Sequence, residues 1–151
     1  MVTAKSLVRN LPVAIQEEYT ILSRKHADPL ASLDNRVLTE LERMLVDIEQ
    51  HGTKVSGTYR GKDWEMVRPH GTSWCGYLLN PGHINNELDA ELDEIAHGGF
   101  TCQLPLGFDC AHYKDFCSIL SPFYDGTTYK DHAFVLDVIK RLIDRIIDYR
   151  N

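Results

Sequence analysis

An amphipathic pattern near the C-terminus places the strongest constraint on the fold of this chain. From Asp131 to Asp148, apolar residues recur every three or four positions, and charged residues occupy the opposite face. The apolar stripe comprises Val135, Val138, Ile139, Leu142, Ile143, Ile146 and Ile147. A stripe this broad predicts a helix that a second layer of structure must cover. We expect that layer to be a β-sheet.

A second helix is predicted over residues 35–50. Its apolar positions fall at the same spacing, and they are Val37, Leu38, Leu41, Met44, Leu45 and Ile48. Asp34 or Asn35 can cap its start, and Gly52 suits its C-terminal turn. The charged residues between the apolar positions are expected to face solvent: Glu40, Glu42, Arg43, Asp47 and Glu49.

Strand patterns fill the chain between the two helices. Residues 53–59 and 64–67 read as a hairpin, with Trp64 in the core, and strands are also expected at 73–79, 100–102 and 106–110. Residues 83–96 contain Leu88, Leu92 and Ile95 at helical spacing and predict a short acidic helix. We therefore predict an α+β fold with a mainly antiparallel sheet of four or five strands, on which both long helices pack.

Composition indicates one domain over residues 1–151, with 1–32 less regular and a short helix near 14–25. The net charge of −6 argues against general binding to a nucleic-acid backbone. No apolar run approaches the roughly 20 residues that a membrane span needs, and no signal peptide is recognisable. We expect a cytoplasmic protein with reduced cysteines, and the sequence leaves its oligomeric state open.

Most of the unusual chemistry lies between Gly71 and Asp115. This stretch holds three of the four cysteines, three of the seven histidines and the aspartates Asp109 and Asp115. The strands at 100–102 and 106–110 should pair antiparallel, because only a few residues separate them. That pairing would bring the segment His97-Gly98-Gly99 close to Asp109, Cys110 and His112.

Two catalytic hypotheses follow from this cluster. In the first, His97 binds a divalent metal together with Asp109, Cys110, His112 or Asp115, and an open position holds water. In the second, no metal is needed: His97 or His112 is the general base, Cys110 is the nucleophile, and an aspartate orients the imidazole.

A third hypothesis is recognition without chemistry. Aromatic residues could stack on a ring, the histidines could contact phosphate, and the glycine pair could present backbone amides to an anion. The ligand-binding residues expected on this basis are Trp74, Tyr77, Gly98, Gly99, Thr101, Tyr113 and Asp115. The plain alternative is that the cysteines are core residues and the histidines are hydrogen-bonded structural groups. We expect His83 to be exposed in either case.

The motifs HGGFT and GFDCAHYKD, preceded by WCGY and PGH, resemble a family of small bacteriophage and bacterial proteins. The resemblance implies a phage or prophage setting and supplies no reaction. The resulting hypothesis is a phage accessory protein that binds, and in its enzymatic form hydrolyses, a small anionic, nucleotide-like ligand. Its catalytic residues would be His97, Asp109, Cys110 and His112. The alternative is a non-enzymatic protein that inhibits a host defence factor.

Overall fold

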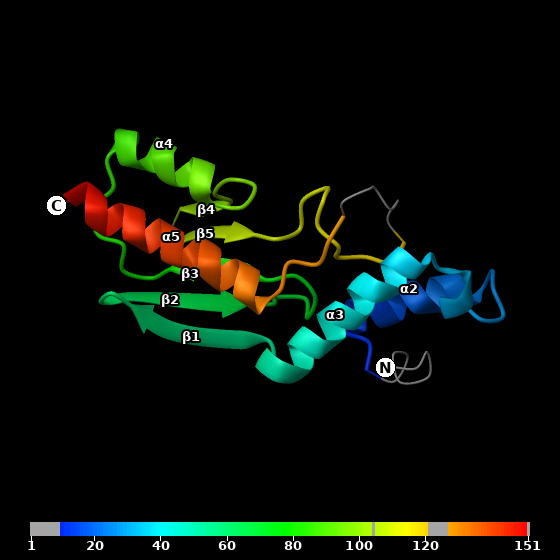
Figure 1. Cartoon of the computed structure of the whole chain (residues 1–151). Coiled ribbons are helices and arrows are strands. Elements are labelled where there is room, and N and C mark those ends of the chain that lie inside the picture. Colours follow the sequence, from blue (N-terminus) through cyan, green and yellow to red (C-terminus); the bar gives the residue numbers. More distant parts are fainter. Residues whose placement is uncertain (1–9, 104, 121–126, 151) are drawn as a thin grey trace.

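The computed structural model describes residues 10–103, 105–120 and 127–150 and confirms the α+β prediction (Figure 1). Five antiparallel strands form one sheet in the order β1-β2-β3-β5-β4. The strands are β1 (Lys54–Tyr59), β2 (Lys62–Val67), β3 (Cys75–Leu78), β4 (Cys102–Gln103) and β5 (Leu106–Asp109). The helices are α2 (Val13–Ser23), the 3₁₀ turn η1 (Leu30–Ser32), α3 (Asn35–His51), α4 (Asn86–Ile95) and α5 (His132–Arg150).

The main core lies between the sheet and the pair α4 and α5. The strand alternation turns Trp64, Met66 and Phe108 toward α5, and these side chains are 7%, 0% and 1% exposed. Gly76 permits a close approach here, because a Cβ atom at this position would lie 2.7 Å from the Phe108 ring and 3.3 Å from Val135. The predicted stripe of the C-terminal helix thus covers one face of the sheet.

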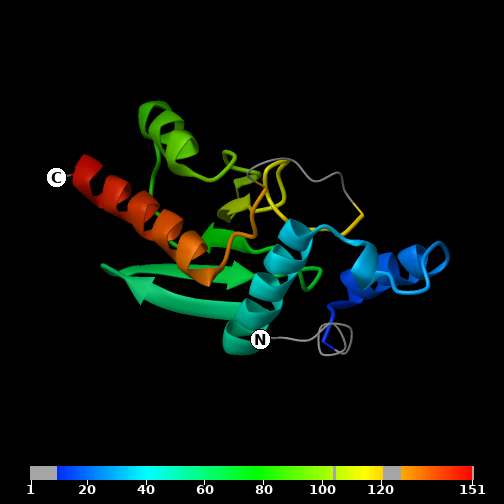
Figure 2. The ribbon, with the colours of Figure 1, turned by 45° about the vertical axis from the view of Figure 1, so that its right-hand side comes forward.

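A second hydrophobic cluster lies beyond the end of the sheet at which β1 begins (Figures 1 and 2). It joins the apolar faces of α2, η1 and α3 to the segment around Phe116 and Tyr129. The buried residues of α3 belong to this cluster, whereas those of α5 belong to the main core. The segment 14–25, expected as a short helix, is α2, and its Ile15 is fully buried. Residues 1–9 of the predicted N-terminal extension lie outside the described residues.

The two predicted hairpins are present. β1 and β2 are joined by Arg60 and Gly61, whose φ angles of 50° and 80° fit the tight, positive-φ turn that suits a twisted hairpin. β4 and β5 pair antiparallel, with Cys102 opposite Gly107. This second hairpin places the HGG segment beside the residues that follow β5. None of the described helices is long and apolar enough to span a bilayer.

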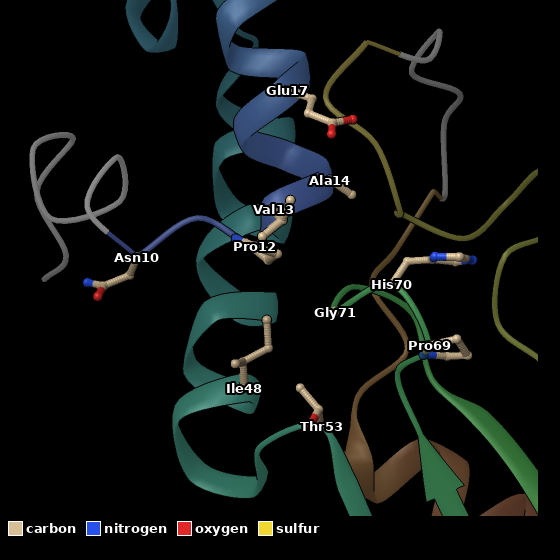
Figure 3. Close-up of a pocket in the computed structure, with 10 residues that line it drawn as sticks. All are labelled: Asn10, Pro12, Val13, Ala14, Glu17, Ile48, Thr53, Pro69, His70 and Gly71. Atoms are coloured by element: carbon tan, nitrogen blue, oxygen red, sulfur yellow. The ribbon is translucent and has the colours of Figure 1, made fainter.

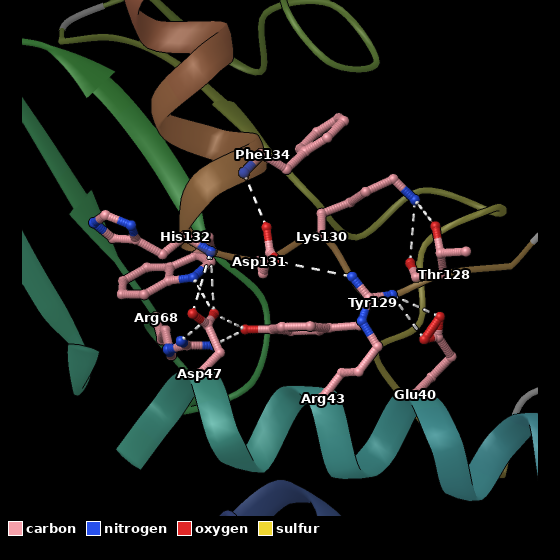
Figure 4. Close-up of polar contacts among 11 residues, drawn as sticks. Glu40, Arg43, Asp47, Arg68, Thr128, Tyr129, Lys130, Asp131, His132 and Phe134 are labelled. Carbon is pink, nitrogen blue, oxygen red and sulfur yellow. Dashed lines mark hydrogen bonds and ion pairs between the residues drawn. The ribbon is translucent and has the colours of Figure 1, made fainter. Parts of the chain in front are cut away.

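The predicted solvent face of α3 is wrong at two positions. Glu40 and Asp47 are only 7% and 6% exposed. Glu40 is paired with Arg43 at 2.9 Å. Asp47 accepts hydrogen bonds from Arg68, Trp74 and Tyr129 at 2.7, 2.8 and 2.5 Å (Figure 4). Helical periodicity missed these residues because charge normally indicates exposure, and a buried charge is tolerated only when such partners are present.

The Asp47 cluster, formed by Asp47, Arg68, Trp74 and Tyr129, ties the second hydrophobic cluster to the sheet and α5. The Arg68 side chain also donates to the backbone oxygens of Gly52 and Thr72, both at 2.9 Å. Its guanidinium lies 3.8 Å from the centroid of the Trp74 ring. Burial opposes ionisation of Asp47, but hydrogen bonds from Tyr129, Trp74 and Arg68 outweigh it and lower the pKa of this carboxyl.

Candidate functional site

The candidate site is built where the loop after α4 meets the loop after β5. His97 lies just after the C-terminus of α4, and its Nε2 atom is 2.9 and 2.8 Å from the two carboxylate oxygens of Asp115. The Asp115 side chain is 1% exposed, whereas that of His97 is 21% exposed. An imidazole that donates from Nε2 to a carboxylate is held in one tautomer and keeps Nδ1 for other partners.

Asp115 is held by three donors. Besides His97, it accepts from the backbone N–H of His112 at 3.0 Å and pairs with Lys130 Nζ at 3.0 Å. A parallel bridge between Asp115 and Thr128 brings Lys130 into position. Burial opposes ionisation, but the His97, His112 and Lys130 hydrogen bonds dominate and lower the pKa of Asp115. Asp115 is therefore an anion that orients His97.

A second histidine faces a second aspartate. His112 Nε2 lies 3.3 Å from Asp109 Oδ1, and their side chains are 33% and 28% exposed. The separation is within ion-pair range, but the atoms are not aligned as a hydrogen bond. His112 Nε2 is buried, and it has no hydrogen-bond partner among the described residues. Asp109 also accepts from the backbone N–H of Ala111 at 3.0 Å.

Gly98 explains how the two loops come together. Its φ of 70° lies in the left-handed region, and a Cβ atom there would overlap Nε2 of His112. The His112 ring therefore rests directly on the backbone of the HGG segment. The predicted proximity of this segment to the residues after β5 is confirmed.

The two imidazoles form a pair. Their ring centroids are 5.6 Å apart at an interplanar angle of 64°. His97 also makes a T-shaped contact with Phe134 in α5, with ring centroids 5.1 Å apart and an interplanar angle of 89°. Nδ1 of each ring makes no hydrogen bond to the described residues.

Three predicted site residues lie elsewhere. Cys110 is 2% exposed in the main core, and burial and the nearby Asp115 raise the pKa of its thiol far above the usual value. This environment opposes thiolate formation and nucleophilic attack. Trp74 is fully buried in the Asp47 cluster. Tyr77 lies on the opposite face of the sheet from α5, with its ring over Gly107.

The remaining predicted residues are close in sequence to His97 or His112. Gly99 has a φ of 81° and approaches Asp93, which accepts from the Phe100 backbone N–H at 2.9 Å. Thr101 is exposed, and its backbone N–H bonds to Gly107. Tyr113 follows His112 and is 72% exposed. Lys114 Nζ lies over the Tyr113 ring, 5.6 Å from its centroid. His83 is exposed, as predicted.

The metal hypothesis gains no support from the arrangement. Within the described ranges, no group of three or more histidine, cysteine, aspartate or glutamate side chains is arranged to hold a metal ion. His97 and His112 could offer one Nδ1 atom each, because the Nε2 atom of each ring already faces an aspartate. A transition-metal site normally takes three or four protein ligands.

Two open cavities lie away from the imidazole pair, and the sequence did not predict them. One of about 510 Å³ is bordered by the start of α2, the end of α3 and the turn at Pro69, His70 and Gly71 (Figure 3). The other, about 480 Å³, lies along α3 and is bordered by Arg43, Asp47 and Asp131. Both depend on how α2 and α3 meet the sheet, which periodicity alone does not specify.

A stacked histidine pair adjoins the Asp47 cluster and was also missed. The rings of His51 and His132 are parallel, with centroids 3.8 Å apart and an interplanar angle of 4°. The backbone N–H of His132 lies 3.2 Å from Asp47 Oδ2. Burial and the neighbouring His51 lower the pKa of His132. No sequence pattern links positions this far apart in the chain, so only the fold reveals this contact.

Comparisons of the chain with protein-family models, with curated proteins and with solved structures gave no match. Functional inference for this protein therefore depends on the geometry of its own residues.

Proposed function

We propose that this protein binds a small anionic, nucleotide-like ligand at the imidazole pair of His97 and His112 and hydrolyses it by acid–base catalysis. The observation that carries the proposal is the hydrogen bond of His97 to the buried, ionised Asp115. A carboxylate that fixes an imidazole in this way makes its other nitrogen an oriented base or acid.

The hydrogen-bond donors of the pair support an anionic ligand. Lys130 lies 3.0 Å from Asp115 and compensates its charge. The carboxylate of Asp109, 3.3 Å from His112, offsets the charge of a protonated His97, and the Nδ1–H of His97 can donate to an anionic oxygen. Charge-assisted hydrogen bonds of this kind are stronger than those between neutral groups. Tyr113, which is 72% exposed, supplies an aromatic surface for a base.

In this proposal the nucleophile is water or a group of the substrate. Cys110 is not the nucleophile, because its thiol is buried in the core. The proposal includes a cytoplasmic location, where nucleotides are abundant, and the phage setting that the motif resemblance implies. The alternative, a non-enzymatic inhibitor of a host defence factor, has no need of two carboxylate-paired imidazoles. It predicts that His97 variants keep full inhibitory activity.

Ligand binding tests the proposal directly. Titration calorimetry with a panel of mononucleotides and dinucleotides should detect a ligand for the wild type. His97→Ala and His112→Ala should each weaken binding at least tenfold, while His26→Ala, at an exposed position outside the site, should bind normally. Failure of every nucleotide to bind, or equal binding by all four proteins, would overturn the proposal.

A further inference from the structure

The two edges of the sheet differ in how well they are protected against a further strand. In the order β1-β2-β3-β5-β4, the edge strands are β1 and β4 (Figure 1). β4 has only two residues, and Pro105, close behind it, has no N–H group to donate. β1 has six residues, contains no proline and pairs with β2 without a bulge. β1 is therefore the edge to which another strand can be added.

The backbone of β1 presents every second residue to the free edge. Directly before the strand, the backbone oxygen of Thr53 accepts a hydrogen bond from the N–H of Arg68 at 2.9 Å. In an antiparallel ladder, such hydrogen-bonded pairs alternate with pairs whose N–H and C=O groups point away from the partner strand. The alternation directs the N–H and C=O groups of Lys54, Ser56 and Thr58 outward. Among the described residues, these three N–H groups have no hydrogen-bond partner.

The side chains of β1 leave an apolar gap on the side of the sheet that faces α5. Val55 is half-buried against the main core. Gly57 has no side chain, and a Cβ atom at this position would lie 2.6 Å from the Trp64 ring. A strand that pairs with β1 can therefore place an apolar side chain opposite Gly57 and beside that ring.

We propose that this edge binds a second copy of the chain, with the two β1 strands antiparallel about a two-fold axis at Ser56. Lys54 of one copy then pairs with Thr58 of the other, and Ser56 pairs with its own counterpart. Each of these pairs exchanges two backbone hydrogen bonds, so every outward N–H group of both strands gains an acceptor. In the same register, Val55 of each copy lies opposite Gly57 of the other and fills the apolar gap.

The charges on the uncovered face of the sheet are complementary in this register. The Lys54 side chain is 66% exposed and lies 4.0 Å from Glu65, at the outer limit of an ion pair. Thr58 donates a hydrogen bond to Asp63 at 2.8 Å. Asp63 of the second copy would lie one strand beyond Thr58, about 5 Å further, and within reach of a lysine side chain. Uncharged Ser56 lies on the axis, so no charge faces its own copy.

The dimer does not depend on the proposed function. The imidazole pair adjoins β4 and β5, at the other side of the sheet from β1. A variant that loses the dimer should therefore bind nucleotides as the wild type does, and either proposal can fail without the other.

Sedimentation equilibrium of the full chain measures the association. The wild type should reach twice the mass of one chain as its concentration rises. Ser56→Pro removes an outward N–H group at a position where an edge strand tolerates proline, so it should stay folded by circular dichroism and monomeric. Ser56→Ala keeps the N–H group and should dimerise as the wild type. A wild type that stays monomeric up to about 1 mM, or equal association by all three proteins, would overturn the proposal.

A charge exchange tests the register. Lys54→Glu and Asp63→Lys should each raise the dissociation constant at least about fivefold, because each change turns two attractive pairs into two repulsive ones. The double variant restores opposite charges between the copies and should return the dissociation constant to within about twofold of the wild type. Additive weakening in the double variant would contradict the contact between these two residues.

Cross-linking tests the position of the axis. In a hydrogen-bonded antiparallel pair the Cα atoms are about 5.5 Å apart, a separation that a disulfide can span. Ser56→Cys should therefore form a covalent dimer under mild oxidation, beyond the level of the wild type with its own four cysteines. Thr58→Cys is exposed on the same face but would meet Lys54 of the second copy, so it should remain at the wild-type level. Equal cross-linking of the two variants would exclude a two-fold axis at Ser56 and overturn the proposal.

Discussion

At the scale of single residues, Gly98 and Gly99 provide a matched test of the site. Both have positive φ angles, 70° and 81°, so alanine at either position carries the same left-handed strain, about 1–2 kcal/mol. A Cβ atom at Gly98 would overlap the His112 ring, whereas one at Gly99 would meet Asp93 at 3.2 Å. Gly98→Ala should therefore displace the His112 ring and weaken nucleotide binding, while Gly99→Ala carries the same backbone strain without that overlap and binds more nearly as the wild type.

The comparison is made by calorimetric titration together with urea denaturation of both variants. An NMR shift of the His112 ring protons in Gly98→Ala alone would report the displacement directly. Equal binding by the two variants would show that the contact between Gly98 and His112 does not position a binding group.

The sequence predicted the residues of the imidazole pair but not all their roles. The short separation between β4 and β5 predicted the approach of His97 to His112, because hairpin pairing depends on local turn length. The prediction of Cys110 as a nucleophile is wrong, because its side chain points into the core. That direction depends on how the chain turns after β5, which the sequence pattern does not specify. Trp74 was assigned to the ligand because its indole partner, Asp47, lies 27 residues away on another element.

At the scale of elements, Asp47 joins α3, the end of β2 and the start of α5. Asp47→Asn removes a buried charge whose partner Arg68 is itself 3% exposed, and we expect a loss of about 3–5 kcal/mol in the free energy of unfolding. The pKa of Asp47 is lowered from 3.8 in the folded protein, so its contribution is complete above about pH 4 and is lost as the pH falls through the folded pKa. Urea denaturation between about pH 2.5 and 7 should show a weaker acid dependence in the variant.

Asp115 also has a lowered pKa, so some acid dependence should remain in Asp47→Asn. Glu49→Gln, at an exposed position of α3, is the control and should keep the wild-type profile. An unchanged profile in Asp47→Asn would contradict the assignment of a charged Asp47 in the folded state.

The stacked rings of His51 and His132 join the C-terminus of α3 to the N-terminus of α5. Burial and His51 lower the pKa of His132 below 6.5, so the unfolded chain binds a proton more readily than the folded protein. The contribution of His132 to the free energy of unfolding is therefore complete above about pH 6.5 and is lost as the solution is acidified through the folded pKa. His132→Phe preserves a stacked ring and should lose less stability than the wild type between about pH 7 and 5. Equal losses, measured by thermal unfolding, would contradict this role.

Helix and strand periodicity predicted these elements well, because α5 and β2 each bury one regular face. Periodicity could not predict how α3 meets the sheet. Its apolar residues are as regular as those of α5, but they pack against α2, Phe116 and Tyr129 rather than on the strands. That choice depends on contacts between distant segments, including the buried pair of Asp47 and Arg68.

At the scale of the whole molecule, two hydrophobic clusters share one chain and are bridged by the Asp47 cluster. Leu41 lies in the cluster of α2 and α3, and Leu142 lies in the core between α5 and the sheet. Both side chains are 0% exposed, so replacement of either by alanine should leave a comparable cavity and reduce stability by about 2–5 kcal/mol. Because buried polar contacts connect the clusters, we expect the domain to unfold as one cooperative unit.

Native-state hydrogen exchange measures this coupling. In a cooperative domain, Leu41→Ala lowers protection in α5 and β3 as much as in α3, and Leu142→Ala lowers protection in α3 to the same degree. If Leu41→Ala affected α2 and α3 alone, the two clusters would be separate folding units. The imidazole pair would then depend only on the main core and on the bridge from Asp115 to Thr128, since His97, His112 and Phe134 all lie on that side of the molecule.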